Sequence, residues 1–363
     1  MQGSYHGVNT SVSARVWYNT PMQILIKNGR VLDAGCVGEQ YAKRTTSPAS
    51  GLDAVCDVAV AEGRVCGLGE SAAASLAPDK PCRVIEAAGL WVTPGFVDLH
   101  VHLREPGQTH KETLESGARA AAAGGFTTVC CMPNTEPVAD SVETIRYIAE
   151  RAREKGGGVN ILPVASITVG QRGEELVPME ALVRAGACAF SEDGKSVANE
   201  NLMREAFRRA AALNVPIFSH CEDKNIAKDG VVSPGAARRF GLSPIPPEAE
   251  SAIVERDILL ARGIENARLH ICHVSAARSV ELIKKYQNEL LTAEVCPHHF
   301  SLCDGDIKSD DGNYKMNPPL QSAADRAVLL EGLRDGVLPI IATDHAPHAL
   351  NEKTRVWRIP LLV

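Results

Sequence analysis

The chain lacks the features that define several large classes of protein. Aromatic side chains make up only 4% of its 363 residues, and no apolar run approaches the ~18 residues that a membrane-spanning helix needs. A formal net charge of −6 argues against a basic surface for nucleic acid or for an anionic membrane. The N-terminal stretch has no continuous apolar core of the kind found in secretory signals. These absences predict a cytoplasmic protein that binds a small soluble molecule, with neither nucleic acid nor membrane as a partner.

Several catalytic and metal-binding patterns are missing as well. The sequence has no G-x-S-x-G elbow, no phosphate-binding P-loop and no G-x-G-x-x-G after a predicted strand. Its 11 cysteines are an odd number, and no two are spaced C-x-x-C, which argues against a thiolate zinc knuckle. Many lie within apolar runs, as is typical of reduced, buried thiols.

The order of apolar and polar stretches divides the chain into four parts. Residues 1–20 are polar and aperiodic, and we expect a loose segment there. Residues 21–94 contain short β-rich runs with hairpin-type turn signals at Asn28-Gly29 and Glu62-Gly63, which predicts a small β-sandwich module. Across residues 95–350, strand-like runs alternate with helical stretches, which predicts an α/β fold, a parallel (β/α)8 TIM-like barrel. Residues 351–363 form an atypical tail.

The first predicted barrel strand, FVDLHVHL at residues 96–103, is the most informative stretch. Strict alternation places His100 and His102 on the same face of this strand. The Pro-Gly pair at 106–107 then ends the strand. A His-x-His pair at the end of an apolar strand suits a metal site better than a packed core.

Further polar residues follow the other predicted strands. Chemistry in such barrels collects at the C-terminal ends of the strands. Together these residues offer four imidazoles and two carboxylates, which is the ligand set expected for one or two Zn²⁺ ions. The metal candidates are His100, His102, Asp193, His220, His273 and Asp344, and Asn134 lies among them.

Other residues compete for these roles. Glu192 is an alternative to Asp193, and Lys195 is a further candidate bridge if it is carboxylated. His270 has odd spacing from His273 and is expected to face the other way as a packed residue. The adjacent His298 and His299 cannot both face the mouth of the barrel, and neither is predicted to be a ligand. His6 and His110 are expected at the surface.

Seven segments between residues 24 and 353 together resemble the amidohydrolase superfamily and, within it, the type I dihydroorotases. They are PGFVDLHVHLREPGQTHKETLESG, GGFTTVCCMPNT, AFSEDGKSV, SHCED, HICHVS, KMNPPL and ATDHAPH. The resemblance implies that His100 and His102 hold one metal ion and that His220 and His273 hold a second. It further implies that Asp193 bridges the two ions and that Asp344 completes the first site and acts as the catalytic proton shuttle. Substrate contacts are implied for Arg104, Asn134, Asn317 and His348.

The implied activity is the reversible hydrolysis of (S)-dihydroorotate to N-carbamoyl-L-aspartate in de novo pyrimidine (UMP) biosynthesis. A hydroxide that bridges two Zn²⁺ ions would attack the ring amide carbonyl, and Asp344 would move the proton. The resemblance also implies a homo-oligomer and aspartate transcarbamoylase as a partner. Two alternatives stay open. One is a noncatalytic homologue that supports the transcarbamoylase, and the other is a different cyclic amidase, such as an allantoinase or a dihydropyrimidinase.

The sequence departs from the family pattern at two places. Gln321 follows KMNPPL where the family has an arginine, which implies some loss of local charge pairing. Family members also continue past DHAPH with a helix and strands that complete the β module. We therefore expect a sandwich that is incomplete at its C-terminal side and an eighth strand with one uncovered face.

Overall fold

The computed structural model describes residues 23–33, 51–309 and 311–353. The predicted loose segment 1–20 and most of the predicted tail lie outside the described residues. The chain forms two compact units, Met1–Phe96 and Val97–Val363. No described helix is long and apolar enough to cross a membrane.

The N-terminal unit is built on a five-stranded sheet in the order β3-β2-β1-β4, with β5 paired to β1. Within the described residues this is one of the two sheets that a sandwich needs. Two short 3-10 helices, η1 (Gly69–Ser71) and η2 (Ala73–Ser75), separate β3 from β4. The strands are β1 (Gln23–Asp33), β2 (Leu52–Ala61), β3 (Arg64–Leu68), β4 (Cys82–Glu86) and β5 (Trp91–Val92).

The two predicted hairpin turns have different outcomes. Glu62 and Gly63 both have positive φ, 52° and 71°, and join the antiparallel strands β2 and β3, so this prediction is confirmed. The prediction of a turn at Asn28-Gly29 is wrong, because β1 continues through it and its register with β2 shifts between Ile26 and Gly29. Asn28 has a φ of 60°, and the pair forms a β-bulge. Turn and bulge demand the same left-handed backbone, so residue type alone does not separate them.

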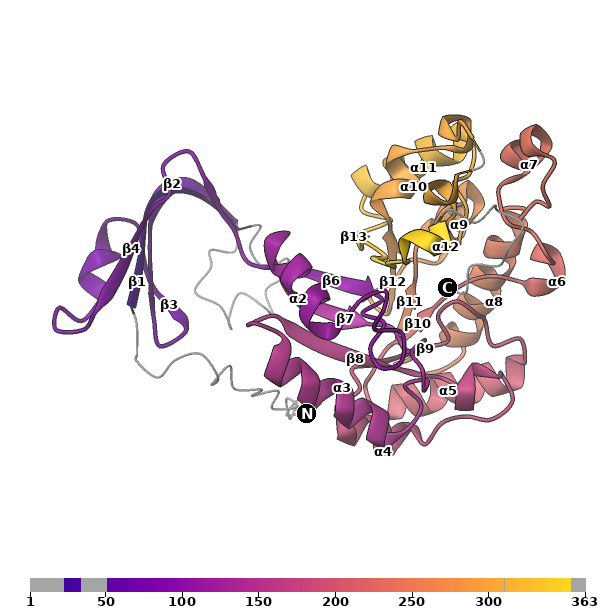
Figure 1. Cartoon of the computed structure of the whole chain (residues 1–363), viewed down its shortest axis with the longest axis horizontal. Coiled ribbons are helices and arrows are strands. Elements are labelled where there is room, and N and C mark those ends of the chain that lie inside the picture. The colour runs from indigo at the N-terminus through magenta and orange to yellow at the C-terminus, as the bar shows by residue number, and fades with distance from the viewer. Residues whose placement is uncertain (1–22, 34–50, 310, 354–363) are drawn as a thin grey trace. The chain divides into compact units, whose positions relative to one another are not determined.

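The second unit contains the predicted barrel. Eight strands follow one another in the order in which they occur along the chain, from β6 to β13 (Figure 1). Val101 at the end of β6 pairs in parallel with His345 beyond β13, and His102 N donates to His345 O at 2.8 Å. This pairing brings the last strand beside the first. The strands are β6 (Phe96–Val101), β7 (Phe126–Cys131), β8 (Asn160–Ser166), β9 (Ala189–Ser191), β10 (Ile217–Ser219), β11 (Leu269–Ile271), β12 (Leu291–Val295) and β13 (Ile340–Ile341).

Seven longer helices alternate with these strands, and each contacts the next along the chain. Their amphipathic patterns explain the packing: α3, for example, buries Ile145, Ile148 and Ala152 on one face. Side chains of Thr113, Ser141, Asn199 and Ser322 cap four of the N-termini. The helices are α2 (Leu114–Ala123), α3 (Val142–Lys155), α4 (Met179–Ala185), α5 (Glu200–Ala212), α8 (Glu248–Arg262), α9 (Ala277–Tyr286) and α11 (Ala323–Arg334).

Shorter helices lie in the loops that follow the strands. They are η3 (Val169–Gln171), α6 (Lys224–Ala227), α7 (Pro234–Phe240), α10 (Pro297–Ser301), η4 (Asp304–Asp306), η5 (Gly312–Tyr314) and α12 (Leu350–Lys353). The apolar pattern of the sequence does not predict them, and α10 lies within the run LTAEVCPHHF, for which that pattern favours a strand.

The outer surface beside the last strand is partly open within the described residues. Ile341 in β13 is 50% exposed. A groove of about 230 Å³ lies between α2 and the segment after β13, with Leu103, Ala120 and Phe126 in its lining. Apolar side chains are therefore accessible on this side of the barrel within the described residues.

Candidate metal centre and active site

The six predicted metal ligands all lie at the C-terminal ends of barrel strands. His100 and His102 end β6 and follow it, and Asp193 comes two residues after β9. His220 directly follows β10, His273 comes two residues after β11, and Asp344 comes three residues after β13. Parallel strands direct these ends to one rim, so residues far apart in the sequence are brought together.

Asp193 lies at the centre of four imidazoles. Its Oδ1 is 3.2 Å from His100 Nε2, 3.6 Å from His220 Nδ1 and 3.7 Å from His273 Nε2. Its Oδ2 is 3.4 Å from His102 Nε2. The side chain is 2% exposed, so this carboxylate is shared among four nitrogen donors in a space that excludes bulk water.

Asp344 approaches the same two nitrogens of the His-x-His pair. Its Oδ1 is 3.1 Å from His102 Nε2 and 3.6 Å from His100 Nε2. The Asp344 side chain is 12% exposed, compared with 2% for Asp193. Of the two carboxylates, Asp344 is therefore the one that a small molecule in the mouth of the barrel can reach more easily.

The electrostatics of the cluster favour ionised carboxylates next to positive charge. Burial acts to raise the pKa of Asp344, but the charges of His100 and His102 outweigh it and lower the pKa to about 2. Burial likewise acts against the charged form of Asp193, yet contacts with His100 lower its pKa well below the usual range. Burial opposes a charged His100, and Asp193 and Asp344 still raise its pKa. Two carboxylates in such a confined space need positive charge between them, which protons or a cation can provide.

The donor atoms fit a metal ion. His100 Nε2 and Asp193 Oδ1 are both buried, and neither has a hydrogen bond of acceptable geometry to another described residue. His220 Nδ1 and His273 Nε2 face each other at 2.9 Å, so two imidazoles converge on the same space. Buried polar atoms are normally satisfied, and unpartnered ones that converge are suited to hold a cation. The mixed nitrogen and carboxylate set suits a borderline divalent metal.

The cluster has a support that sequence reasoning missed. Glu294 in β12 is fully buried, and its Oε1 lies 2.7 Å from His100 Nδ1 and accepts from His273 N at 3.2 Å. Its Oε2 lies 2.9 Å from His270 Nε2. Glu294 thus fixes the ring of His100 and leaves its Nε2 directed at Asp193. An acidic residue within the apolar run LTAEV was the available signal.

The alternatives considered for the bridge lie elsewhere. Glu192 accepts from the main-chain N–H groups of Ile167 and Thr168, both at 3.1 Å. The Lys195 Nζ donates to Gln171 O at 2.9 Å. His270 is packed against Thr292 Oγ1 at 2.9 Å and against Glu294 Oε2 at 2.9 Å, the carboxylate that also contacts His100. Asp193 is therefore the carboxylate that the fold brings to the histidines.

Arg104 and His348 form a separate cationic corner of the site. The Arg104 guanidinium is almost fully buried, and its Nε donates to Pro347 O at 3.2 Å. Its Nη2 lies 3.5 Å from His348 Nε2, and its buried Nη1 has no partner among the described residues. Burial and the neighbouring Arg104 lower the pKa of His348 to about 4, so that imidazole is neutral near pH 7.

The two predicted substrate-binding amides contact the histidines. Asn134 Oδ1 lies 2.8 Å from His102 Nδ1, and its Nδ2 donates to Asp193 Oδ2 at 3.4 Å. Asn317 Nδ2 lies 3.5 Å from His220 Nε2, and its Oδ1 is buried without a partner among the described residues. Gln321 is buried, and its main-chain oxygen accepts from Asp304 N at 2.8 Å.

Three residues at the same rim have strained backbone conformations. Arg104, His273 and Asp344 have φ values of 60°, 33° and 49°, in the left-handed region that residues other than glycine rarely adopt. Such conformations cost on the order of 1–3 kcal/mol each and cluster at functional sites. The surrounding structure therefore holds these three residues in place at an energetic cost.

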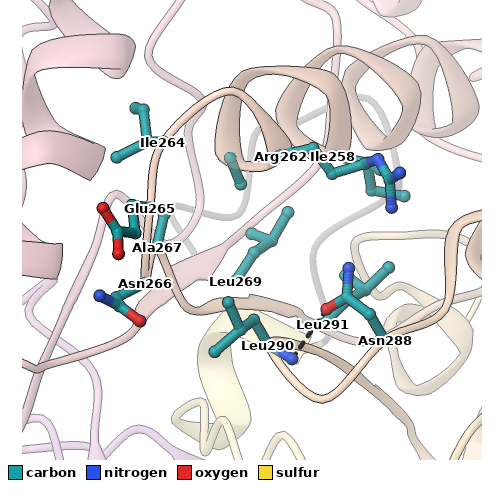
Figure 2. A pocket seen from close by; sticks show the side chains of 11 residues that line it. Ile258, Arg262, Ile264, Glu265, Asn266, Ala267, Leu269, Asn288, Leu290 and Leu291 are labelled. Atoms are coloured by element: carbon teal, nitrogen blue, oxygen red, sulfur yellow. Dashed lines mark hydrogen bonds between the residues drawn. The ribbon is translucent and has the colours of Figure 1, made fainter.

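A larger cavity exists at the other end of the strands. It measures about 410 Å³, and Leu269 and Leu291, at the N-terminal ends of β11 and β12, form part of its wall (Figure 2). Its polar lining residues are Arg262, Glu265, Asn266 and Asn288. The lining contains no histidine and no predicted site residue. We therefore place the chemistry at the polar rim and not in this cavity.

The barrel carries a His-x-His pair at the end of its first strand and an aspartate after its last, as the resemblance to the amidohydrolase superfamily implies. The family model described as dihydro-orotase-like matches residues 89–279. The chain belongs to this dihydroorotase family.

Curated relatives named dihydroorotase support this assignment. The protein from Solibacter usitatus is 46% identical over 335 residues, which cover 92% of this chain and 73% of the relative. The one from Bacillus subtilis is 50% identical over 279 residues, or 76% of this chain and 65% of the relative.

Solved structures share the fold at lower sequence identity. The L-hydantoinase (dihydropyrimidinase) from Arthrobacter aurescens has a TM-score of 0.71 at 22% identity and covers 91% of this chain and 70% of its own. The dihydropyrimidinase from Brevibacillus agri has a TM-score of 0.70 at 24% identity, and the match covers 93% of this chain and 72% of that protein.

Proposed function

We propose that this protein is a dihydroorotase that hydrolyses (S)-dihydroorotate reversibly to N-carbamoyl-L-aspartate. The main support is the Asp193 cluster, in which one buried carboxylate lies within 3.7 Å of an imidazole nitrogen on each of His100, His220 and His273. Relatives named dihydroorotase at 46% and 50% identity give the substrate class. Ring closure, the reverse direction, would serve de novo pyrimidine biosynthesis.

We assign two zinc ions to the cluster. His100, His102 and Asp344 would hold one ion, His220 and His273 the other, and Asp193 would contact both. Bound there, Zn²⁺ lowers the pKa of a coordinated water toward neutrality and polarises an amide carbonyl. Glu294 and Asn134 would hold the rings of His100 and His102 so that their Nε2 atoms face the ions.

Asp344 is assigned the proton transfers. Its carboxylate is ionised at neutral pH, because the pKa is lowered to about 2, and it can accept a proton from the attacking water. In hydrolysis it then returns that proton to the ring nitrogen as the C–N bond breaks. In ring closure the same oxygen takes the proton from the carbamoyl nitrogen, as microscopic reversibility requires.

Arg104 and His348 are assigned to the α-carboxylate of the substrate. A guanidinium with a free, buried Nη1 offers the directed N–H donors that a carboxylate accepts. His348, which lies beside Arg104, is neutral near pH 7, so the corner carries one positive charge and matches one carboxylate. A hydantoin or dihydropyrimidine ring has no such carboxylate, so burial of this arginine favours dihydroorotate.

Turnover of four substrates by the zinc-loaded protein tests the proposal. We expect dihydroorotate to have a kcat/KM at least about 100-fold above those of hydantoin, dihydrouracil and allantoin, because only its carboxylate pairs with Arg104. Preference for one of the neutral rings would replace the proposal with another cyclic amidase. Tight zinc binding with no turnover of any substrate would favour the noncatalytic alternative.

Two proposals about assembly rest on the family resemblance. We propose a homo-oligomer and an association with aspartate transcarbamoylase. Light scattering of the protein alone and mixed with a purified transcarbamoylase tests both, and a monomer that does not change mass on mixing contradicts them.

A further inference from the structure

Three potential metal ligands lie together outside the cluster around Asp193. Cys296 directly follows β12, and His298 and His299 belong to α10, which begins at the next residue. One donor atom of each of these residues lies within 4.8 Å of the donor atoms of the other two. The two imidazole rings have their centroids 4.2 Å apart at an angle of 61°. We call these three residues the Cys296 cluster.

Two nitrogens of the Cys296 cluster are buried without a partner. Neither His298 Nε2 nor His299 Nδ1 has a hydrogen bond to any described residue. His299 is only 3% exposed, so bulk water does not satisfy its ring. Burying a polar atom without a partner is unfavourable, which makes two such atoms in one cluster unusual.

The tautomer of His299 makes its free nitrogen a ligand. His299 Nε2 lies 2.9 Å from Pro318 O, and because a carbonyl only accepts, Nε2 carries the proton. In the neutral ring, Nδ1 then has a lone pair and no donor to meet it. A ring N–H that donates to a main-chain carbonyl while the other nitrogen binds a metal is the usual pattern at metal sites.

Burial also keeps both imidazoles uncharged. Burial lowers the pKa of His298, and burial together with the neighbouring His298 lowers the pKa of His299 well below its usual range. Both rings are therefore available as neutral ligands near pH 7. The Cys296 thiol is fully buried, and burial raises its pKa, so its proton leaves only when a cation takes its place.

We propose that Cys296, His298 and His299 bind one thiophilic divalent ion such as Zn²⁺, separate from the ions held around Asp193. On binding, the S–H bond of Cys296 breaks, a sulfur–metal bond forms, and the proton passes to the buffer with no change of oxidation state. One thiolate and two imidazoles favour Zn²⁺, Co²⁺ or Cd²⁺ over Mg²⁺ and Ca²⁺. Three protein ligands leave a fourth position for water or an anion.

The Cys296 cluster is distinct from the centre around Asp193 but connected to it. None of its members is among the six residues assigned there. Glu294, which positions His100, lies two residues before Cys296. His299 is bonded to Pro318, next to Asn317. An ion in this cluster would therefore fix α10 between two residues that contact the proposed zinc ligands.

Cobalt absorption tests this proposal with a readout that the other centre does not give. Protein that has been freed of zinc is titrated with Co²⁺, and a thiolate-to-cobalt charge-transfer band in the near ultraviolet is expected. The ligands assigned around Asp193 include no sulfur, so cobalt bound in that centre gives no such band. Absence of the band from the wild-type protein, with Co²⁺ in excess, overturns the proposal.

Matched serine variants identify the thiolate. Cys296→Ser is expected to abolish the band, whereas Cys303→Ser, at a buried thiol that donates to Asp306 Oδ2 at 3.3 Å, should retain it. Cys272→Ser is the stricter control, because Cys272 lies in a group with His100 and Glu294. A band that is lost in Cys272→Ser and retained in Cys296→Ser would contradict metal binding at the Cys296 cluster.

A second variant covers the case in which Cys296→Ser does not fold. His298→Gln alters the most exposed member of the cluster and leaves the thiol in place. Loss of one ligand is expected to weaken Co²⁺ binding at least about tenfold, measured as the rise in Kd from the band. An unchanged Kd in a folded His298→Gln protein contradicts the proposal.

Discussion

Asp193 is the residue on which the proposed chemistry depends most. Its two oxygens approach nitrogens from the ends of three strands: the His-x-His pair of β6, His220 after β10 and His273 after β11. The neighbouring Glu192 is also buried but accepts hydrogen bonds from a main-chain loop. Two adjacent carboxylates thus have different surroundings, and only one of them can share a cation with the histidines.

Asp193→Asn is expected to reduce bound zinc and to lower turnover at least about 100-fold, because an amide neither carries the charge nor bridges two cations. Metal analysis and dihydroorotate assays of the purified variant measure both. Glu192→Gln is the matched control. This variant is expected to be less stable than the wild type but to bind the same amount of zinc. Equal zinc contents in wild type and Asp193→Asn would contradict the role of Asp193.

Arg104→Met tests the carboxylate contact. Removing the guanidinium while keeping a similar apolar volume is expected to raise KM for dihydroorotate roughly 10- to 150-fold, the equivalent of about 1.5–3 kcal/mol for a hydrogen bond to a charged group. Zinc content should stay unchanged, since the hydrogen bonds of the Arg104 side chain go to Pro347 O and His348 and not to a proposed ligand. The exposed Arg153→Met serves as the control, and an unaltered KM in Arg104→Met speaks against the contact.

Individual residues differ in how far the sequence could predict them. Strand alternation places His100 and His102 on one face, and Asp344 follows a predicted strand. Position alone left Glu192 as an alternative to Asp193, and the family resemblance selected Asp193. Glu294 was missed because an acidic residue inside an apolar strand does not by itself show which ring it faces. The Cys296 cluster was missed because the two histidines were judged on a strand pattern, whereas they lie on the helix α10.

The loops after the strands are the elements that shape the site. Glu105, directly after Arg104, accepts from Leu114 N at 2.8 Å at the start of α2. Glu105 also accepts from two residues of α3, from Tyr147 Oη at 2.8 Å and from Arg151 Nε at 3.1 Å. One carboxylate therefore holds the loop that carries Arg104 against two helices. Burial opposes its charge, yet these donors lower its pKa overall.

Glu105→Gln is expected to lower the free energy of unfolding by about 1–3 kcal/mol at pH 7. A depressed carboxyl pKa stabilises the fold above the unfolded-state value of about 4.3, and that stabilisation is lost as pH falls through the folded-state pKa. The difference between variant and wild type in urea unfolding should shrink below about pH 4. The exposed Glu154→Gln is the control and should change stability by less than about 0.5 kcal/mol. A Glu105→Gln difference that does not depend on pH would contradict this explanation.

Elements with a recognisable apolar pattern were predictable, and short helices without one were not. The seven longer helices and eight barrel strands have apolar periodicity over several turns or a continuous apolar run. Helices such as α6 and α10 are four and five residues long, too short for periodicity to identify them. Asn28-Gly29 has the residue types of a hairpin turn, and only the pairing of β1 with β2 reveals a bulge.

At the scale of the whole molecule, the six proposed ligands come from β6, β9, β10, β11 and β13, so they span the barrel from its first strand to its last. Ions bound there connect the two strands that close the barrel. Any ligand that binds only the folded state stabilises it by mass action.

Removal of metal by a chelator is therefore expected to lower Tm by several degrees. A ligand whose free concentration is about 100 times its Kd adds about 2.7 kcal/mol to the free energy of unfolding. For a unit of this size, each kcal/mol corresponds to roughly 2–4 °C in Tm. Differential scanning calorimetry before chelation, after it and after zinc is restored measures the effect. An unchanged Tm on metal removal would indicate that these side chains do not hold an ion in the folded protein.

The proposed hydrolase depends on a metal that these six side chains assemble. The most direct measurement is dihydroorotate turnover by metal-free protein as Zn²⁺ is added back in known amounts. Turnover should be absent at the start, rise as the sites around Asp193 fill, and stay absent in Asp193→Asn at every zinc concentration. Full turnover by the metal-free protein, or by Asp193→Asn, would contradict the proposal.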